Sequence, residues 1–103
     1  MGNTKVELNG KTILVTGGTG SFGRHFVDYV LEHYKPKKII IYSRDEYKQF
    51  VMDNDYKAHR DVLRFFIGDV RDESRLEMAM NGVDYVIHAA ALQQQHGPGG
   101  QHG

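Results

Sequence analysis

The stretch Ile13–Gly23, ILVTGGTGSFG, decides the fold of this chain. Its first four residues are apolar or β-branched without interruption, which is typical of a strand buried on both faces. The remainder fits the pattern T-G-x-x-G-x-x-G from Thr16 and the pattern G-x-G-x-x-G from Gly18. Apolar residues then recur at helical spacing between Phe22 and Leu31. A strand, a glycine-rich turn and a helix in this order indicate a site for the diphosphate of a dinucleotide.

Each part of this turn has a physical role. Glycine permits a tight turn and lets the main chain approach a diphosphate, and the last glycine lets helix and strand pack closely. The helix N-terminus offers free N–H groups and a partial positive charge to the phosphates. A glycine-rich turn without a ligand is the alternative interpretation. The candidate diphosphate-binding residues are Gly17, Thr19, Gly20, Ser21, Phe22 and Gly23.

The rest of the chain alternates between strand and helix patterns. In the helix that we predict at Asp45–His59, Tyr47, Phe50 and Val51 are expected to face inward. The alternation requires right-handed βαβ crossovers and a parallel sheet, with the strand order 3-2-1-4. We therefore predict an α/β fold, a Rossmann-type parallel sheet of which the chain holds the first mononucleotide-binding half. Strands are predicted at Lys11–Thr16, Lys38–Ser43, Val62–Ile67 and Val83–Ala91, and helices at Ser21–Tyr34, Asp45–His59 and Asp72–Met80.

The end of the second strand bears on the choice of cofactor. An acid ~20 residues after the loop would bind the ribose 2′-hydroxyl of NAD, whereas an arginine there accommodates the 2′-phosphate of NADP. Ser43 and Arg44 occupy that place, and Lys48 follows one helical turn onward. A hydroxyl, a guanidinium and an ammonium group all suit a phosphate. Asp45 and Glu46 are interpreted as capping residues of the next helix. The sequence therefore favours NADP over NAD.

The ends of the third and fourth strands supply further candidates. Asp69 can bind the adenine amino group while Val70 packs on the ring, and a turn or capping acid is the alternative for Asp69. Small residues after the fourth strand would leave room for the ribose and nicotinamide, or else allow close packing. His88 is interpreted as a strand-face residue rather than a base. We assign no catalytic residue and no metal site. The small residues are Ala89, Ala90 and Ala91.

Composition excludes several classes of protein. The chain has 103 residues, of which 40% are hydrophobic and 25% charged, as in ordinary globular domains. Thirteen basic residues balance thirteen acidic ones, so a nucleic-acid-binding surface is not indicated. No apolar run is long enough for a membrane span. Cysteine is absent, and a reducing cytoplasm is the expected location.

We expect three segments along the chain. Residues 1–10 are a polar lead-in, residues 11–92 an NADP-binding partial Rossmann domain, and residues 93–103 a tail. The tail reads QQQHGPGGQHG and has no apolar residue, so it is expected to be disordered. His96 and His102 within it could bind a transition metal weakly, but a non-native or linker-like end is the favoured interpretation.

Several segments together resemble the extended short-chain dehydrogenase/reductase family. Within it they are most similar to the inverting UDP-N-acetylglucosamine 4,6-dehydratases of bacterial surface-glycan and flagellin-sugar synthesis. The Ser-Phe-Gly of the loop, the Ser-Arg-Asp-Glu after the second strand and the Gly-Asp-Val-Arg-Asp after the third make the resemblance specific. The segments that carry it are Ile13–Gly23, Ile39–Gln49, Phe65–Asp72 and Val83–Leu92.

The resemblance implies a cofactor, a substrate and a reaction. NADP⁺ would oxidise the sugar of a nucleotide-sugar substrate at C4, water would be eliminated across C5 and C6, the hydride would return to C6, and C5 would be inverted. The resemblance places Thr19–Phe22 at the diphosphate, Ser43, Arg44 and Lys48 at the 2′-phosphate, Asp69 and Val70 at adenine, and Ala89–Ala91 along the reacting end.

The chain also departs from this family. The family's catalytic Tyr-x-x-x-Lys has one literal match, Tyr34–Lys38, which Pro36 interrupts. Gln93 stands where the family tends to have a lysine. We therefore expect the NADP-binding portion of a dehydratase, inactive by itself. A fragment of a related nucleotide-sugar epimerase or reductase, and a stand-alone NADP-binding or interaction module, are the alternatives. The fourth strand would form an exposed edge, through which we expect self-association.

Overall fold

The computed structural model describes residues 7–89, which form parallel strands alternating with helices. The predicted alternation is confirmed, although the predicted second helix is divided into an α-helix and a short 3-10 turn. Ala90, Ala91, the tail and residues 1–6 lie outside the described residues. The elements are β1 (Thr12–Thr16), α1 (Ser21–His33), β2 (Lys38–Ser43), α2 (Glu46–Asp55), η1 (Lys57–His59), β3 (Leu63–Ile67), α3 (Glu73–Ala79) and β4 (Tyr85–His88).

The sheet has the order β3-β2-β1-β4 with every pair parallel, so the predicted topology is confirmed. The register places Thr16 between Tyr42 and His88, and Ser43 beside Ile67. Because all strands run the same way, their carboxyl ends meet at one edge of the sheet. Within residues 7–89, β4 pairs with β1 alone, and association through its other edge remains a prediction.

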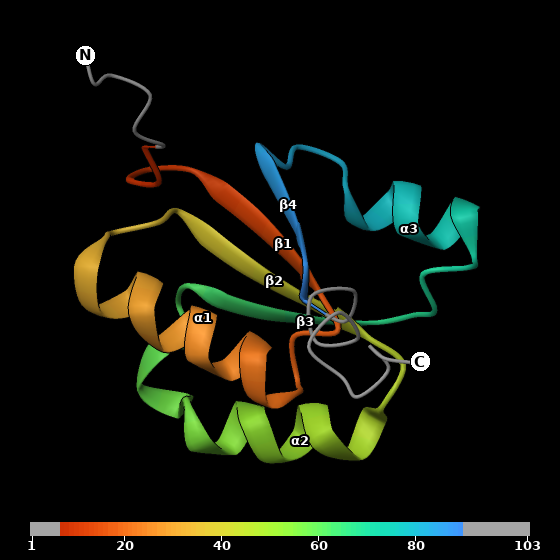
Figure 1. Ribbon diagram of the computed structural model, residues 1–103, viewed down its shortest axis with the longest axis horizontal. Coiled ribbons are helices and arrows are strands. Elements are labelled where there is room, and N and C mark those ends of the chain that lie inside the picture. Colours follow the sequence, from red (N-terminus) through yellow and green to blue (C-terminus); the bar gives the residue numbers. More distant parts are fainter. Residues whose placement is uncertain (1–6, 90–103) are drawn as a thin grey trace, which may run out of the picture.

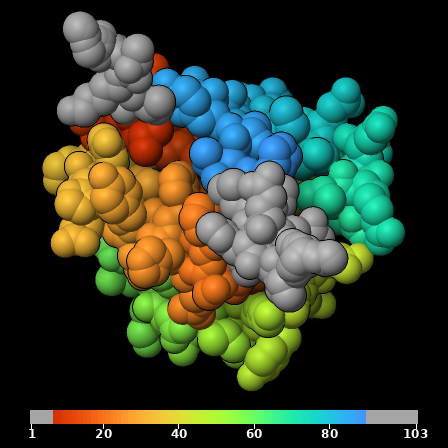
Figure 2. Space-filling model, viewed as in Figure 1, coloured from red at the N-terminus to blue at the C-terminus, as the bar shows by residue number. Residues whose placement is uncertain are grey.

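Helices cover the two faces of the sheet unequally (Figure 1). One face packs against α1 and α2, where Val27, Val30 and Met52 join the inward side chains of the strands. The other face packs against α3, and its core contains Leu14 and Tyr42. The space-filling view shows α1 and α2, coloured orange to green, on one side and β4 with α3, blue to teal, on the other (Figure 2).

The inward face of α2 differs from the prediction. Tyr47 and Phe50 are 73% and 70% exposed, so the expectation that they face the core is wrong. Gln49 and Met52 are buried instead. The side-chain amide of Gln49 lies 3.2 Å from the carbonyl oxygen of Ser43 and 3.1 Å from that of Phe66. This polar anchor to two strands sets the rotation of the helix.

Candidate functional site

The glycine-rich loop after β1 holds the start of α1 close to the strand. Gly17 adopts the left-handed conformation, with φ of 69°, and its N–H donates to the carbonyl of Tyr42 at 2.8 Å. A Cβ on Gly23 would lie 2.4 Å from main-chain atoms of Gly18. No side chain fits between these two segments, so the spacing of the glycines follows from the packing of helix on loop.

The N-terminus of α1 lacks the capping that the other two helices have. Asp45 and Asp72 cap α2 and α3 through their carboxylates, and each of these helices has a glutamate in its first turn. In α1 the N-cap is Gly20, without a side-chain hydrogen bond and without an acid in the first turn. The first hydrogen bond of the helix is donated by the N–H of Arg24 to the carbonyl oxygen of Gly20. The earlier amides, those of Ser21, Phe22 and Gly23, therefore suit an anion.

A cleft of about 370 Å³ lies between this loop and the ends of β2 and β3. It brings together six of the residues chosen from the sequence, which come from three separate segments. Lys48 is exposed on α2 and Ala89 is buried after β4, and neither is among the described residues that line the cleft. The six candidates in the lining are Gly17, Thr19, Ser43, Arg44, Asp69 and Val70, and the remainder are Tyr42, Asp45, Gly68 and Arg71.

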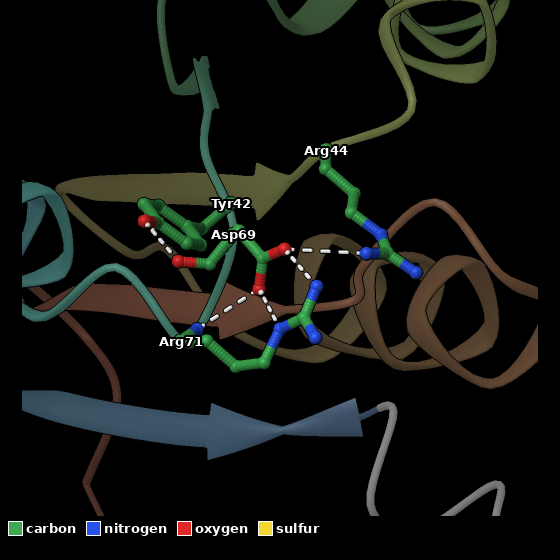
Figure 3. Close-up of polar contacts among 4 residues, drawn as sticks. All are labelled: Tyr42, Arg44, Asp69 and Arg71. Atoms are coloured by element: carbon green, nitrogen blue, oxygen red, sulfur yellow. Dashed lines mark hydrogen bonds and ion pairs between the residues drawn. The ribbon is translucent and has the colours of Figure 1, made fainter.

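Asp69 lies between two arginines on the wall of the cleft (Figure 3). The Nη2 of Arg71 donates to its Oδ2 at 2.9 Å, and the main-chain N–H of Arg71 donates to its Oδ1 at 2.9 Å. The Nη1 of Arg44 donates to the same Oδ2 at 3.2 Å. Hydrogen bonds from the Arg71 side chain and main chain hold the pKa of the Asp69 carboxyl well below its usual range. This cluster of two cations and one anion keeps a net positive charge.

Tyr42 fixes the turn that carries Asp69. Its hydroxyl donates to the main-chain oxygen of Asp69 at 2.9 Å, and its ring packs at a tilt against Phe66. A Cβ on Gly68 would lie 2.4 Å from the Tyr42 hydroxyl, so this turn needs glycine there. Burial raises the pKa of the Tyr42 hydroxyl above its ordinary value of 10.0, so the hydroxyl keeps its proton to a higher pH than a free tyrosine does.

Three other groups of residues considered in the sequence have structural roles, and of these only Asp45 lines the cleft. Asp45 caps α2, as interpreted, by accepting from the N–H of Lys48 at 3.0 Å. His88 lies exposed at the end of β4, with its Nδ1 3.0 Å from the hydroxyl of the buried Thr16. Tyr34 ends α1 and Lys38 begins β2, so the literal Tyr-x-x-x-Lys does not lie on one helix.

Sequence reasoning missed Tyr42, Gly68 and Arg71 as parts of the cleft. Tyr42 read only as a strand residue, since its hydroxyl contact spans 27 positions of the chain. Arg71 did leave a local signal, because an aspartate can hydrogen-bond the main chain two residues onward. The spacing of Asp69 and Arg71 fits that turn, and a guanidinium at its third position can return to the same carboxylate.

Comparison with known proteins places these features in a family. A family model described as polysaccharide biosynthesis protein matches residues 13–97. Two inverting UDP-N-acetylglucosamine 4,6-dehydratases of Campylobacter jejuni are 60% identical over 85 residues, covering 82% of this chain and 25% of each relative. A UDP-glucose 4-epimerase of Rickettsia bellii is 47% identical over 87 residues, with the same coverage. The chain thus spans about a quarter of the length of these relatives.

A solved structure supports the same fold. The X-ray structure of Pen from Bacillus thuringiensis is similar with a TM-score of 0.74 and 36% identity, over 79% of this chain and 25% of that one. The four parallel strands and three α-helices of residues 7–89 are therefore a Rossmann-like unit. None of the helices in that range has the length and apolar character to cross a bilayer.

Proposed function

The chain belongs to the polysaccharide biosynthesis protein family, within the extended short-chain dehydrogenases/reductases, and from this premise we propose that it is the NADP-binding portion of a nucleotide-sugar 4,6-dehydratase acting on UDP-N-acetylglucosamine. The identity of 60% to two dehydratases, against 47% to an epimerase, supports the dehydratase. The match to the epimerase keeps a nucleotide-sugar epimerase as the second candidate.

The observation that carries the cofactor proposal is the cleft beside the uncapped start of α1. The free amides of the first turn of α1 would hold the diphosphate. Arg44, at the end of β2 and 72% exposed, would bind the 2′-phosphate. Asp69 and Val70, on the turn after β3, would hold adenine. When bound, NADP accepts and returns a hydride, and the residues of this chain bind and orient it.

We propose that the 103-residue chain binds NADP but does not turn over a sugar. Proton transfer at C4 needs a positioned acid or base within hydrogen-bond reach of the substrate. The cleft is lined by arginines and ionised or capping aspartates rather than by a group poised to exchange a proton near neutral pH. Incubation with UDP-N-acetylglucosamine and NADP⁺ should leave the sugar unchanged, and any product would contradict this part of the proposal.

Calorimetric titration of the purified chain tests cofactor binding. We expect NADP to bind about tenfold more tightly than NAD, because one added contact between a phosphate and a guanidinium contributes a difference of that size. Arg44→Ala should bring the affinity for NADP down to that for NAD. Arg60→Ala is a matched control. Arg60 is also an exposed arginine in an ion pair, with Asp53, but it does not line the cleft. Absence of heat with either nucleotide would refute the proposal.

A chimera separates the two candidate reactions. This chain can replace the matched 85 residues of a Campylobacter dehydratase, or the matched 87 residues of the Rickettsia epimerase. If the chain comes from a dehydratase, the first chimera should retain its parent's activity and the second should lose most of its own. The reverse outcome would favour the epimerase.

A further inference from the structure

The two arginines around Asp69 hold it unequally. Arg71 donates three hydrogen bonds to the carboxylate, from its main-chain N–H at 2.9 Å, its Nε at 3.2 Å and its Nη2 at 2.9 Å. Arg44 donates one, at 3.2 Å. Arg71 is two positions away on the same turn, whereas Arg44 reaches over from the end of β2 (Figure 3). Arg71 alone can therefore satisfy Asp69, and Arg44 is the arginine that can leave.

An unneutralised Asp69 would oppose a phosphate at Arg44. The carboxylate would compete with the phosphate for the guanidinium of Arg44, and it would repel the phosphate because both are anions. The Arg71 guanidinium weakens both effects, since it donates to both oxygens of the carboxylate in a bidentate arrangement. The strength with which Arg44 binds a phosphate thus depends on a residue that need not touch the phosphate.

We propose that Arg71 is a positioning residue for cofactor selectivity, which neutralises Asp69 and so frees Arg44 to bind the 2′-phosphate of NADP. This inference rests on the proposed function and adds to it a residue that acts through another. One experiment distinguishes this indirect role of Arg71 from direct contact between Arg71 and the phosphate. If Arg71 acts through the charge of Asp69, removing that charge should make Arg71 dispensable.

Two small nucleotides isolate the 2′-phosphate. Adenosine 2′,5′-bisphosphate differs from adenosine 5′-monophosphate by that group alone, so the ratio of their dissociation constants measures its recognition. The ratio is measured by calorimetry on the wild-type chain, Arg71→Ala, Asp69→Asn, the double variant and the control Arg60→Ala. Arg71 is 79% exposed in its side chain, so its truncation leaves the core intact, and circular dichroism verifies the fold of each variant.

The wild-type chain should prefer the bisphosphate. Arg71→Ala should reduce this preference about tenfold, a change of about 1.4 kcal/mol. Asp69→Asn introduced together with Arg71→Ala should restore most of it, because a neutral amide neither retains Arg44 as a partner nor repels the phosphate. Asp69→Asn alone should weaken both nucleotides through adenine and keep their ratio, and Arg60→Ala should also keep it.

Two results would overturn the inference while the proposed function stands. In one, Arg71→Ala retains the wild-type preference. In the other, the double variant discriminates no better than Arg71→Ala, which would mean that Arg71 contacts the phosphate itself. A wild-type chain that binds neither nucleotide, or binds both equally, would instead refute NADP binding and the inference with it.

Discussion

Replacing Gly23 with alanine tests whether α1 is pressed against the glycine-rich loop. The added methyl group would lie 2.4 Å from the Cα and the carbonyl oxygen of Gly18, where ordinary contacts begin at 3.4 Å. Both neighbours are main chain, so no rotamer change can relieve the overlap. The helix and the loop must therefore separate by about 1 Å in a region packed as tightly as a protein interior.

The expected loss of stability is the difference between two opposing effects. Overpacking of this kind destabilises a protein by about 1–3 kcal/mol. Alanine is a better helix former than glycine, which offsets about 1 kcal/mol because Gly23 lies in the first turn of α1. The difference is a fall of up to about 2 kcal/mol in the free energy of unfolding, and the overlap with main-chain atoms favours the upper part of that range. The two effects have opposite signs, so the direction of the change alone decides between them.

Urea unfolding followed by circular dichroism measures this change, with the midpoint shifted and the slope unaltered. Gly18→Ala is the matched control. Its methyl group would meet side-chain tips of Ile41 and Val15 at 3.1–3.2 Å, and these can yield, so we expect a loss below about 1 kcal/mol. A Gly23→Ala variant as stable as the wild type, or more stable, would show that helix propensity governs this position and that the loop does not depend on the close approach.

Two further predictions concern α2 and its surroundings. Burial, and then the hydrogen bond to Asp28 at 2.5 Å, raise the pKa of Tyr56 from 10.0 to about 12. The folded chain thus holds this proton more tightly than the unfolded chain. The stabilisation that the protonated Tyr56 hydroxyl contributes is complete below pH 10 and is lost as the pH rises through about 12. Tyr56→Phe should therefore flatten the decline of the urea midpoint between these pH values. An unchanged decline would show that Tyr56 does not cause it. Gln49→Leu should lower the free energy of unfolding by about 1–3 kcal/mol in the same assay, because the carbonyls that accept from the Gln49 amide lose their buried donor. If the variant is as stable as the wild type, an apolar side chain at this position stabilises α2 as well as the hydrogen bonds do.

The order of elements and the topology of the sheet could be predicted from the sequence because each depends on local pattern. An unbroken apolar strand, the glycine loop and short connections leave few alternatives to a right-handed parallel arrangement. The candidates at the ends of β1, β2 and β3 follow from the same reasoning, since parallel strands bring their carboxyl ends to one edge. Gly17, Arg44 and Asp69 were found in this way and line one cleft.

The face of α2 could not be predicted, and the reason is specific. Tyr47, Phe50 and Val51 have the spacing of an apolar stripe, which favours burial when the helix is considered alone. The buried residues are Gln49 and Met52, and the amide of Gln49 reaches carbonyls on β2 and β3. Those acceptors lie side by side only after the strands have paired, so no pattern within the helix encodes them. The pairing of Arg44 with Asp69, 25 positions apart, was hidden for the same reason.

Affinity and selectivity for the cofactor should reside in different parts of the proposed site. In the proposed complex the amides at the start of α1 would bind the diphosphate, which NAD and NADP share, so a change such as Gly23→Ala should weaken the binding of both cofactors by the same factor. The groups around Asp69 come from the ends of β2 and β3, where we propose that the 2′-phosphate, the group that distinguishes NADP from NAD, would bind. Changes at Arg44 or Arg71 should therefore act on NADP alone. The fold makes this separation feasible because the loop is positioned by main-chain packing, whereas the arginines are exposed side chains that can be exchanged without disturbing it.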